Sequence, residues 1–214
     1  MQGRFENRRE AGRRVAAKLS AYRGRPDVLV LALPRGGVPV AEEIAGELHA
    51  PLDVLVVRKL GFAGDPELAM GAVGPRGLRV LNRRVIDDFE ITAGDIERAA
   101  QRELRELNRR EQVYRAGLPP LELKDRIVIL VDDGIATGST MQAAIGVAHA
   151  GRAARVVVAV PVVAREAYFE LRGRADEFVT LHIPKEFYAV GDFYEAFPQL
   201  TDAEVCEALA HAVH

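Results

Sequence analysis

Short apolar runs separated by stretches of helical periodicity constrain the fold of this chain more than any other feature. Four runs are rich in β-branched residues and almost continuous: 28–33, 54–57, 127–131 and 156–163. Strands of this kind are typically buried on both faces, as in a parallel sheet. Helix-like stretches follow the first and third runs, at 38–48 and 139–150. This alternation predicts an α/β fold built from right-handed crossovers.

Other segments extend this pattern or interrupt it. Residues 177–183 and, more weakly, 77–81 have the composition of strands. Residues 8–22 carry apolar side chains at helical spacing, which predicts an N-terminal helix. Residues 61–77 are dense in glycine and follow a predicted strand, so we expect a mobile loop there. Residues 94–116 predict a heavily charged helix with a narrow apolar stripe, typical of a surface helix or an oligomer contact.

The size and composition of the chain predict one globular domain. It has 214 residues, of which 49% are hydrophobic and 28% are charged. The formal net charge of -2 gives no global basic field for nucleic acid or a membrane surface. Cys206 is the only cysteine, which excludes an intramolecular disulfide and a multi-cysteine metal site. The charged first residues do not resemble a signal peptide, and no apolar run approaches the roughly 20 residues of a membrane span. We therefore expect a soluble cytoplasmic protein.

The stretch VILVDDGIATGST at 128–140 carries the strongest chemical signal. A predicted buried strand ends in Asp132 and Asp133, and a predicted helix begins shortly after them. In an open parallel sheet, ligands bind in the crevice beyond the carboxyl ends of the strands, so both carboxylates are placed where a ligand would lie. The residues that open the helix offer unpaired backbone N–H groups and hydroxyls, which together suit a phosphate group. These residues are Thr137, Gly138, Ser139 and Thr140.

The kind of phosphate can be narrowed from the same stretch. It lacks the G-x-x-x-x-G-K-[ST] loop that binds nucleoside triphosphates, and no lysine lies near it. A terminal phosphate monoester therefore fits better than a triphosphate. Two neighbouring carboxylates can accept hydrogen bonds from two vicinal hydroxyls, so the pattern indicates a sugar phosphate. The alternative interpretation is a strand capped by Asp133, with Ser139 or Thr140 as an ordinary helix N-cap.

The stretch resembles the signature with which type I phosphoribosyltransferases bind phosphoribosyl diphosphate (PRPP): a hydrophobic strand, an acidic pair and a Thr-Gly loop. The resemblance implies an α/β fold with a twisted, mostly parallel sheet flanked by helices, a small variable hood and an inserted charged helix. It implies one phosphoribosyltransferase domain over residues 1–214, with its core at 28–163, a mobile loop at 61–77 and a helical insertion at 82–118. The N-terminal helix and residues 184–214 are the candidate hood.

Two further turns match this family after other predicted strands. The first strand leads into Arg35, Gly36 and Gly37, where the family holds pyrophosphate through backbone amides. Glycine permits the close approach, and an arginine can donate two hydrogen bonds to phosphate oxygens. The second strand leads into Arg58 and Lys59, where the family places a basic residue for the pyrophosphate, and Lys59 is favoured for that role. Taken alone, the two turns would be an ordinary tight turn and a solvated strand end.

The resemblance implies that a nitrogen nucleophile, such as a nucleobase, displaces pyrophosphate from carbon 1 of PRPP through an oxocarbenium-like transition state. Asp132 and Asp133 would hold the ribose hydroxyls. Arg35, Lys59 and substrate-bound Mg²⁺ would neutralise the leaving group. Substrate oxygens and water would hold the Mg²⁺, with no metal site made by the protein alone. The substrate-binding set comprises Gly36, Gly37, Arg58, Ala136, Thr137, Gly138, Ser139 and Thr140.

The acceptor stays open on the sequence. Hypoxanthine-guanine transferases carry an acidic residue where Ala136 stands, and the segment 61–77 lacks the lysines of the orotate enzymes. Both substrate classes are therefore disfavoured. Within that segment, Glu67 could assist proton transfer or cap a short helix. Aromatic residues crowd 187–197, where one could stack on a planar acceptor or pack the tail against the sheet. The resemblance also suggests a homodimer.

Three other functions are compatible with parts of the sequence. A PRPP-binding regulator that shares the fold but lacks turnover is the main alternative; the intact glycine turn and Lys59 favour an enzyme. A serine hydrolase is disfavoured because no G-x-S-x-G motif surrounds Ser139. A Rossmann oxidoreductase is disfavoured because the first turn lacks G-x-G-x-x-G.

Overall fold

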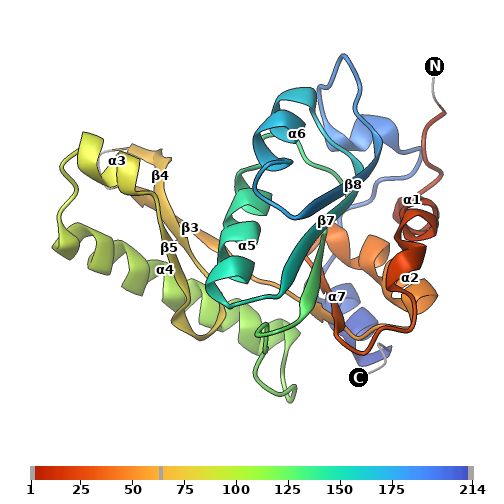
Figure 1. Cartoon of the computed structure of the whole chain (residues 1–214), viewed down its shortest axis with the longest axis horizontal. Helices are drawn as coiled ribbons and strands as arrows, with labels where there is room; N and C mark the ends of the chain where they lie inside the picture. Colours follow the sequence, from red (N-terminus) through yellow and green to blue (C-terminus); the bar gives the residue numbers. More distant parts are fainter. Residues whose placement is uncertain (1–2, 63–64, 212–214) are drawn as a thin grey trace.

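A five-stranded parallel sheet forms the centre of the computed structural model, which describes residues 3–62 and 65–211 (Figure 1). The strand order is β2-β1-β6-β7-β8, and every neighbouring pair is parallel. The strands are β1 (Val28–Ala32), β2 (Leu52–Val54), β6 (Ile127–Val131), β7 (Arg155–Val162) and β8 (Glu177–His182). The α/β fold class predicted from the alternating runs is thereby confirmed.

Helices cover both faces of this sheet. One face is covered by α1 (Arg8–Ala16), the 3-10 helix η1 (Ala17–Tyr22) and α2 (Gly37–Leu48), and the other by α5 (Ser139–Ala150) and α6 (Arg165–Leu171). Side chains alternate along β1, so that Val30 packs in the first core and Leu31 in the second. This burial on both sides explains why the strands are continuously apolar in sequence.

The chain between β2 and β6 forms a separate part, which we call the arm (Figure 1, left). It contains β3 (Arg58–Phe62), β4 (Asp65–Val73), η2 (Pro75–Gly77), β5 (Arg79–Leu81), α3 (Arg83–Asp88) and α4 (Ala93–Tyr114). Its strands form an antiparallel sheet in the order β3-β4-β5, and α4 packs against β3. Helices α3 and α4 thus occupy the segment where the sequence predicts a helical insertion.

Two sequence predictions in this region are wrong. The second strand of the parallel sheet is β2, and the apolar residues 55–57, which the sequence assigns to it, lie outside the strand. The glycine-dense segment 61–77 is not a loop for most of its length, because β3, β4 and η2 occupy it. A side chain at Gly71 of β4 would collide with the backbone oxygen of Val80 on β5, so this glycine permits close strand pairing. Residues 63–64 lie outside the described residues, and closure of the segment over a substrate stays a prediction.

The start of the described chain pairs with residues 193–195, beside the parallel sheet. Phe5 forms a parallel bridge with Tyr194, and its backbone forms 2.8 Å hydrogen bonds with Phe193 and Glu195. The 3-10 helix η3 (Val190–Phe193) leads into this contact, and α7 (Asp202–His211) follows it and packs against α2 and α4. We call residues 193–198 the C-terminal strap. Within residues 3–62 and 65–211, no helix is both long and apolar enough to cross a lipid bilayer.

Candidate active site

The acidic turn after β6 lies against the turn after β1, so two of the predicted site segments are brought together. The strands β1 and β6 are neighbours, and Ala32 pairs with Val131 at their carboxyl ends. Gly36 packs so closely that any side chain there would overlap the carboxylate of Asp133. A Cβ atom at Gly37 would lie 2.5 Å from the backbone oxygen of Val131. The contact between the two turns therefore requires glycine at both positions.

A cavity of about 200 Å³ lies beside the acidic turn, at the amino end of α5. Its lining comprises Asp132, Gly134, Ile135, Ala136, Thr137, Gly138, Thr140, Met141 and Val190. Gly138 precedes the helix with a φ of 79°, in the left-handed region that favours glycine. Among the described residues no side chain caps α5, so the N–H groups of its first turn are available to an anion. The Ser139 hydroxyl lies 3.3 Å from that of Thr137, so the hydroxyls of this turn are also gathered at the amino end of α5.

The two aspartates of the acidic turn have different surroundings. Asp132 is half-buried and lines the cavity, and its carboxylate accepts a 2.9 Å hydrogen bond from the backbone N–H of Asp133. Burial raises the pKa of Asp132 well above its ordinary value, and the charge of Asp133 adds to the rise. Asp133 is buried and accepts a 2.8 Å hydrogen bond from Nε of Arg8 on α1. Burial raises the pKa of Asp133 too, while the Arg8 guanidinium opposes that rise.

Arg8 was not predicted as a site residue, and Tyr194 and Phe197 belong to the aromatic stretch for which the sequence left acceptor stacking and packing of the tail as alternatives. The Tyr194 hydroxyl donates a 2.5 Å hydrogen bond to the backbone oxygen of Asp133. Burial raises the pKa of Tyr194, so this hydroxyl stays protonated and remains a donor. The Arg8 guanidinium lies over the Phe197 ring, 3.7 Å from its centroid. The aromatic crowding at 187–197 is a signal for the two rings, whereas Arg8 is one of several arginines on α1 and nothing local distinguishes it.

Arg35 is directed toward α4 and α7. The peptide bond between Pro34 and Arg35 is cis. The Arg35 side chain is half-exposed and lines a second cavity, of about 400 Å³, together with Arg109 and Tyr114 of α4. The Arg35 guanidinium lies 3.6 Å from the carboxylate of Asp202 on α7. That carboxylate also accepts a 2.7 Å hydrogen bond from the Tyr114 hydroxyl. The structure thus pairs Arg35 with the C-terminal helix, and its role toward pyrophosphate stays a prediction.

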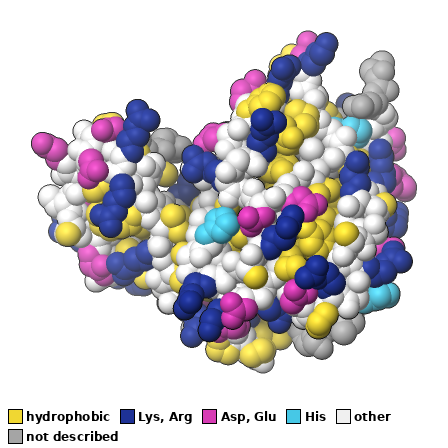
Figure 2. Space-filling model, viewed as in Figure 1, with side chains coloured by type: hydrophobic (Ala, Val, Ile, Leu, Met, Phe, Trp, Pro, Cys, Tyr) yellow, Lys and Arg dark blue, Asp and Glu magenta, His cyan; other side chains and the backbone are white. Residues whose placement is uncertain are grey.

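Arg58 and Lys59 lie on β3 of the arm rather than at the end of a parallel strand. Arg58 donates two hydrogen bonds, of 3.0 and 2.8 Å, to Glu103 of α4, which holds the Arg58 side chain within the arm. Lys59 is exposed and lines a groove of about 810 Å³ that also contains Ser139 of α5. Figure 2 shows the hollow between the arm, at left, and the rest of the molecule. Of the two cations, Lys59 is the one that shares a groove with a predicted phosphate-binding residue.

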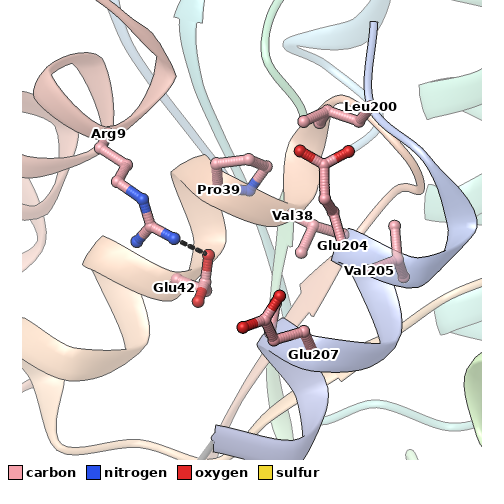
Figure 3. Close-up of a pocket in the computed structure, with 9 residues that line it drawn as sticks. Arg9, Val38, Pro39, Glu42, Leu200, Glu204, Val205 and Glu207 are labelled. Carbon is pink, nitrogen blue, oxygen red and sulfur yellow. Dashed lines mark hydrogen bonds and ion pairs between the residues drawn. The ribbon is translucent and has the colours of Figure 1, made fainter.

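A further cavity, of about 300 Å³, lies between α2 and α7 and has a different character (Figure 3). Glu42, Glu204 and Glu207 line it, and Arg9 of α1 pairs with Glu42 at 2.8 Å. Three carboxylates against one guanidinium disfavour a phosphate group. We therefore place the candidate site at the acidic turn and not in this cavity.

Comparison with known proteins identifies the family of the chain. The family model of the phosphoribosyl transferase domain matches residues 3–196. Two Mycobacterium tuberculosis proteins, Rv0571c and MT0597, each named as a candidate phosphoribosyl transferase, are 47% identical to this chain over 208 residues. The match covers 97% of this chain and 47% of each relative, so the chain spans about half the length of the curated relatives it matches.

Solved structures show the same fold. The crystal structure of TT1426 from Thermus thermophilus has a TM-score of 0.90 and 43% sequence identity, covering 99% of this chain and 100% of that one. The AQ2163 protein from Aquifex aeolicus has a TM-score of 0.52 at 12% identity, covering 97% of this chain and 87% of that one. At that identity the likeness concerns the fold alone.

Proposed function

The chain belongs to the phosphoribosyl transferase family, and we propose that it transfers the phosphoribosyl group of PRPP to a nitrogen nucleophile. The bond between carbon 1 of the ribose and the diphosphate oxygen breaks, and a carbon–nitrogen bond forms. The bonding electron pair leaves with pyrophosphate, and the nucleophile loses its proton. The observation that carries this proposal is the contact between the glycine turn after β1 and the acidic turn after β6, beside the amino end of α5.

The amino end of α5 is the proposed site for the 5-phosphate. Its first-turn N–H groups and the hydroxyls of Thr137, Ser139 and Thr140 supply donors at the positive end of the helix dipole. Binding energy gained at this phosphate, away from the reacting carbon, positions the ribose for attack. Asp132 in the cavity then accepts hydrogen bonds from the sugar hydroxyls and provides negative potential near the developing oxocarbenium ion.

The glycine turn and the arm are proposed to receive the pyrophosphate. Glycine at positions 36 and 37 would let the backbone approach the diphosphate closely. Lys59 would supply a cation from the groove that it shares with Ser139. Mg²⁺ enters as part of the substrate, held by diphosphate oxygens and water. Among residues 3–62 and 65–211, no three His, Cys, Asp or Glu side chains are grouped so as to hold a metal ion. Arg35 would join the diphosphate by leaving Asp202, its partner in this structure.

The acceptor is proposed to be a nucleobase or a related planar nitrogen compound, bound under a hood formed by residues 184–198 and the N-terminal helix. Val190 of η3 lines the cavity, which supports this location. The rings of Phe187 and Phe193 stack on each other with their centroids 5.3 Å apart, and the Tyr194 side chain is buried. Tyr188 is 85% exposed, so its ring is the one most accessible to a planar acceptor.

Two measurements on the purified protein test this function. Calorimetric titration with PRPP and Mg²⁺ should give saturable binding in the roughly micromolar to millimolar range typical of enzyme substrates. Incubation with PRPP, Mg²⁺ and a panel of nucleobases should release pyrophosphate with at least one of them, and mass spectrometry should identify the ribosylated product. Binding without release for every acceptor would favour the PRPP-binding regulator, for which the pairing of Arg35 with Asp202 is the supporting contact. No heat on titration would refute both functions.

A further inference from the structure

We propose that Arg8 is a positioning residue of the sugar site, which acts by holding Asp133 against the glycine turn while Asp132 faces the cavity. This inference rests on the proposed function. Arg8 lies on α1, a long way in sequence from the acidic turn, and it is only 8% exposed. A buried arginine has a strong requirement for partners, so the identity of those partners indicates what the side chain does.

Three contacts fix the Arg8 guanidinium from different directions. Its Nε donates to the Asp133 carboxylate at 2.8 Å, and its Nη1 donates to the backbone oxygen of Pro198 at 2.8 Å. Its plane lies over the Phe197 ring. The planar fork of arginine can serve two acceptors and an aromatic face at once, which the ammonium group of lysine cannot do. Arg8 thereby ties the acidic turn to the C-terminal strap.

The same aspartate is confined on its other sides. Gly36 packs directly against the Asp133 carboxylate, so that group has no room to rotate toward the glycine turn. The Tyr194 hydroxyl holds the backbone oxygen of Asp133 at 2.5 Å. Because Asp132 directly precedes Asp133 and accepts a hydrogen bond from the Asp133 N–H, the orientation of Asp132 in the cavity depends on how Asp133 is held. Loss of Arg8 should therefore weaken the binding of the sugar by Asp132, although Arg8 itself does not contact the substrate.

Charge gives this arrangement a second effect, which distinguishes positioning from mere packing. The charged or titratable groups that face Asp133 are Arg8 of α1, Asp132 of the same turn and Tyr194 of the strap, and Glu10 of α1 acts on Tyr194. Arg8 is the cation in this set, and its charge lowers the pKa of both aspartates. Without it, both carboxylates take up protons at higher pH. Since protonated carboxyl groups accept hydrogen bonds from sugar hydroxyls less well, PRPP binding should be lost at a higher pH as well.

The test compares three variants of the full chain. Arg8→Met removes the charge and the donors but keeps an unbranched side chain, and Arg8→Lys keeps the charge without the fork. Arg13→Met is the matched control, because Arg13 lies on the same helix, is 57% exposed and pairs only at 3.5 Å with Glu43. The readouts are the Kd for PRPP with Mg²⁺ by calorimetry as a function of pH, and the thermal unfolding temperature.

We expect Arg8→Met to weaken PRPP binding about tenfold or more. The pH below which PRPP binding is lost, which we call the acid limit of binding, should shift to a higher value. Arg8→Lys should weaken binding less and leave the acid limit near that of the wild type, and Arg13→Met should change neither. Wild-type Kd and wild-type acid limit in a folded Arg8→Met protein would overturn the inference. Should that variant not fold, an unchanged Kd in Arg8→Lys overturns it instead. A wild-type protein that binds no PRPP overturns the proposed function itself, so the two failures are distinguishable.

Discussion

The parallel sheet and the arm contribute to the candidate site in different ways. The groups contributed by the sheet, Asp132 and the glycine turn, lie on short turns directly after buried, hydrogen-bonded strands. The group contributed by the arm, Lys59, is an exposed side chain on β3, which is an edge strand of a small antiparallel sheet. A sugar needs acceptors placed to within a fraction of an ångström, whereas a diphosphate can be neutralised by a cation at longer range. In the proposed site, the sheet would therefore provide precisely placed acceptors and the arm would provide positive charge.

The largest effect is expected from Asp132→Asn, which changes a hydrogen-bond acceptor that the parallel sheet contributes to the proposed site. An amide accepts fewer hydrogen bonds than a carboxylate and carries no charge, so pyrophosphate release should fall by at least about a hundredfold. Pyrophosphate release measured with a saturating acceptor checks this. Release at the wild-type rate would remove Asp132 from the sugar site.

The same substitution, Asp132→Asn, should increase the stability of the protein although it lowers its activity. Burial and the charge of Asp133 raise the pKa of Asp132 in the folded protein, so the ionised carboxylate destabilises the fold above that pKa. Asp132→Asn should therefore be more stable than wild type at neutral pH. This advantage should shrink as the pH falls toward the ordinary carboxyl range near about 4, where Asp132 is protonated in the folded protein. Urea unfolding at several pH values measures it.

Asp133→Asn is the contrasting variant, because it leaves Arg8 buried without its carboxylate and should lose stability.

Gly37→Ala should have the next largest effect, because it forces apart the two turns of the sheet. The added methyl group would lie 2.5 Å from the backbone oxygen of Val131, which cannot move without disturbing β6. We expect a loss of about 1–3 kcal/mol in the free energy of unfolding, together with weaker PRPP binding. Gly46→Ala on α2 is the matched control, since it meets nothing within 4 Å and should stabilise the helix by roughly 0.5–1 kcal/mol. Equal behaviour of the two variants in urea unfolding would contradict the close contact between the turns.

Substitutions in the arm should have the smallest effects. Of its two cations, Lys59 should affect catalysis and Arg58 should affect stability. Lys59→Ala is expected to lower kcat/KM for PRPP roughly tenfold with an unchanged unfolding temperature, because Lys59 is exposed and contributes charge. Arg58→Ala is expected to lower stability by about 1 kcal/mol through loss of its pairing with Glu103, with little change in kcat/KM. Steady-state kinetics and thermal unfolding of both variants decide this. A loss of kcat/KM in Arg58→Ala and not in Lys59→Ala would make Arg58 the pyrophosphate ligand. It would contradict the proposal that the exposed cation of the arm contributes the charge.

The sequence predicted the sheet better than the arm, for reasons that individual residues make clear. Strand Ile127–Val131 and helix Ser139–Ala150 occur at the predicted bounds, because both are defined by local pattern and by the turn between them. Leu55 and Val56 misled the prediction of β2, since they are buried without belonging to a strand. The glycines at 61–77 looked like a loop because strand pairing leaves no signal within a single segment. Arg8 meets Asp133 across 125 positions, and no local pattern encodes a contact of that range.

The bridge between Phe5 and Tyr194 has a consequence for how the protein is made. A translating ribosome that has just produced the acidic turn has yet to add Tyr194, which binds that turn, and Pro198, whose carbonyl binds Arg8. Once β6 has left the ribosome it can pair with β1, but Arg8 has no contact with Phe197 or Pro198 until those residues have been made. Synthesis must reach Pro198 before Arg8 has all three of its contacts, so an unfinished chain carries the acidic turn before Asp133 is fully held in place.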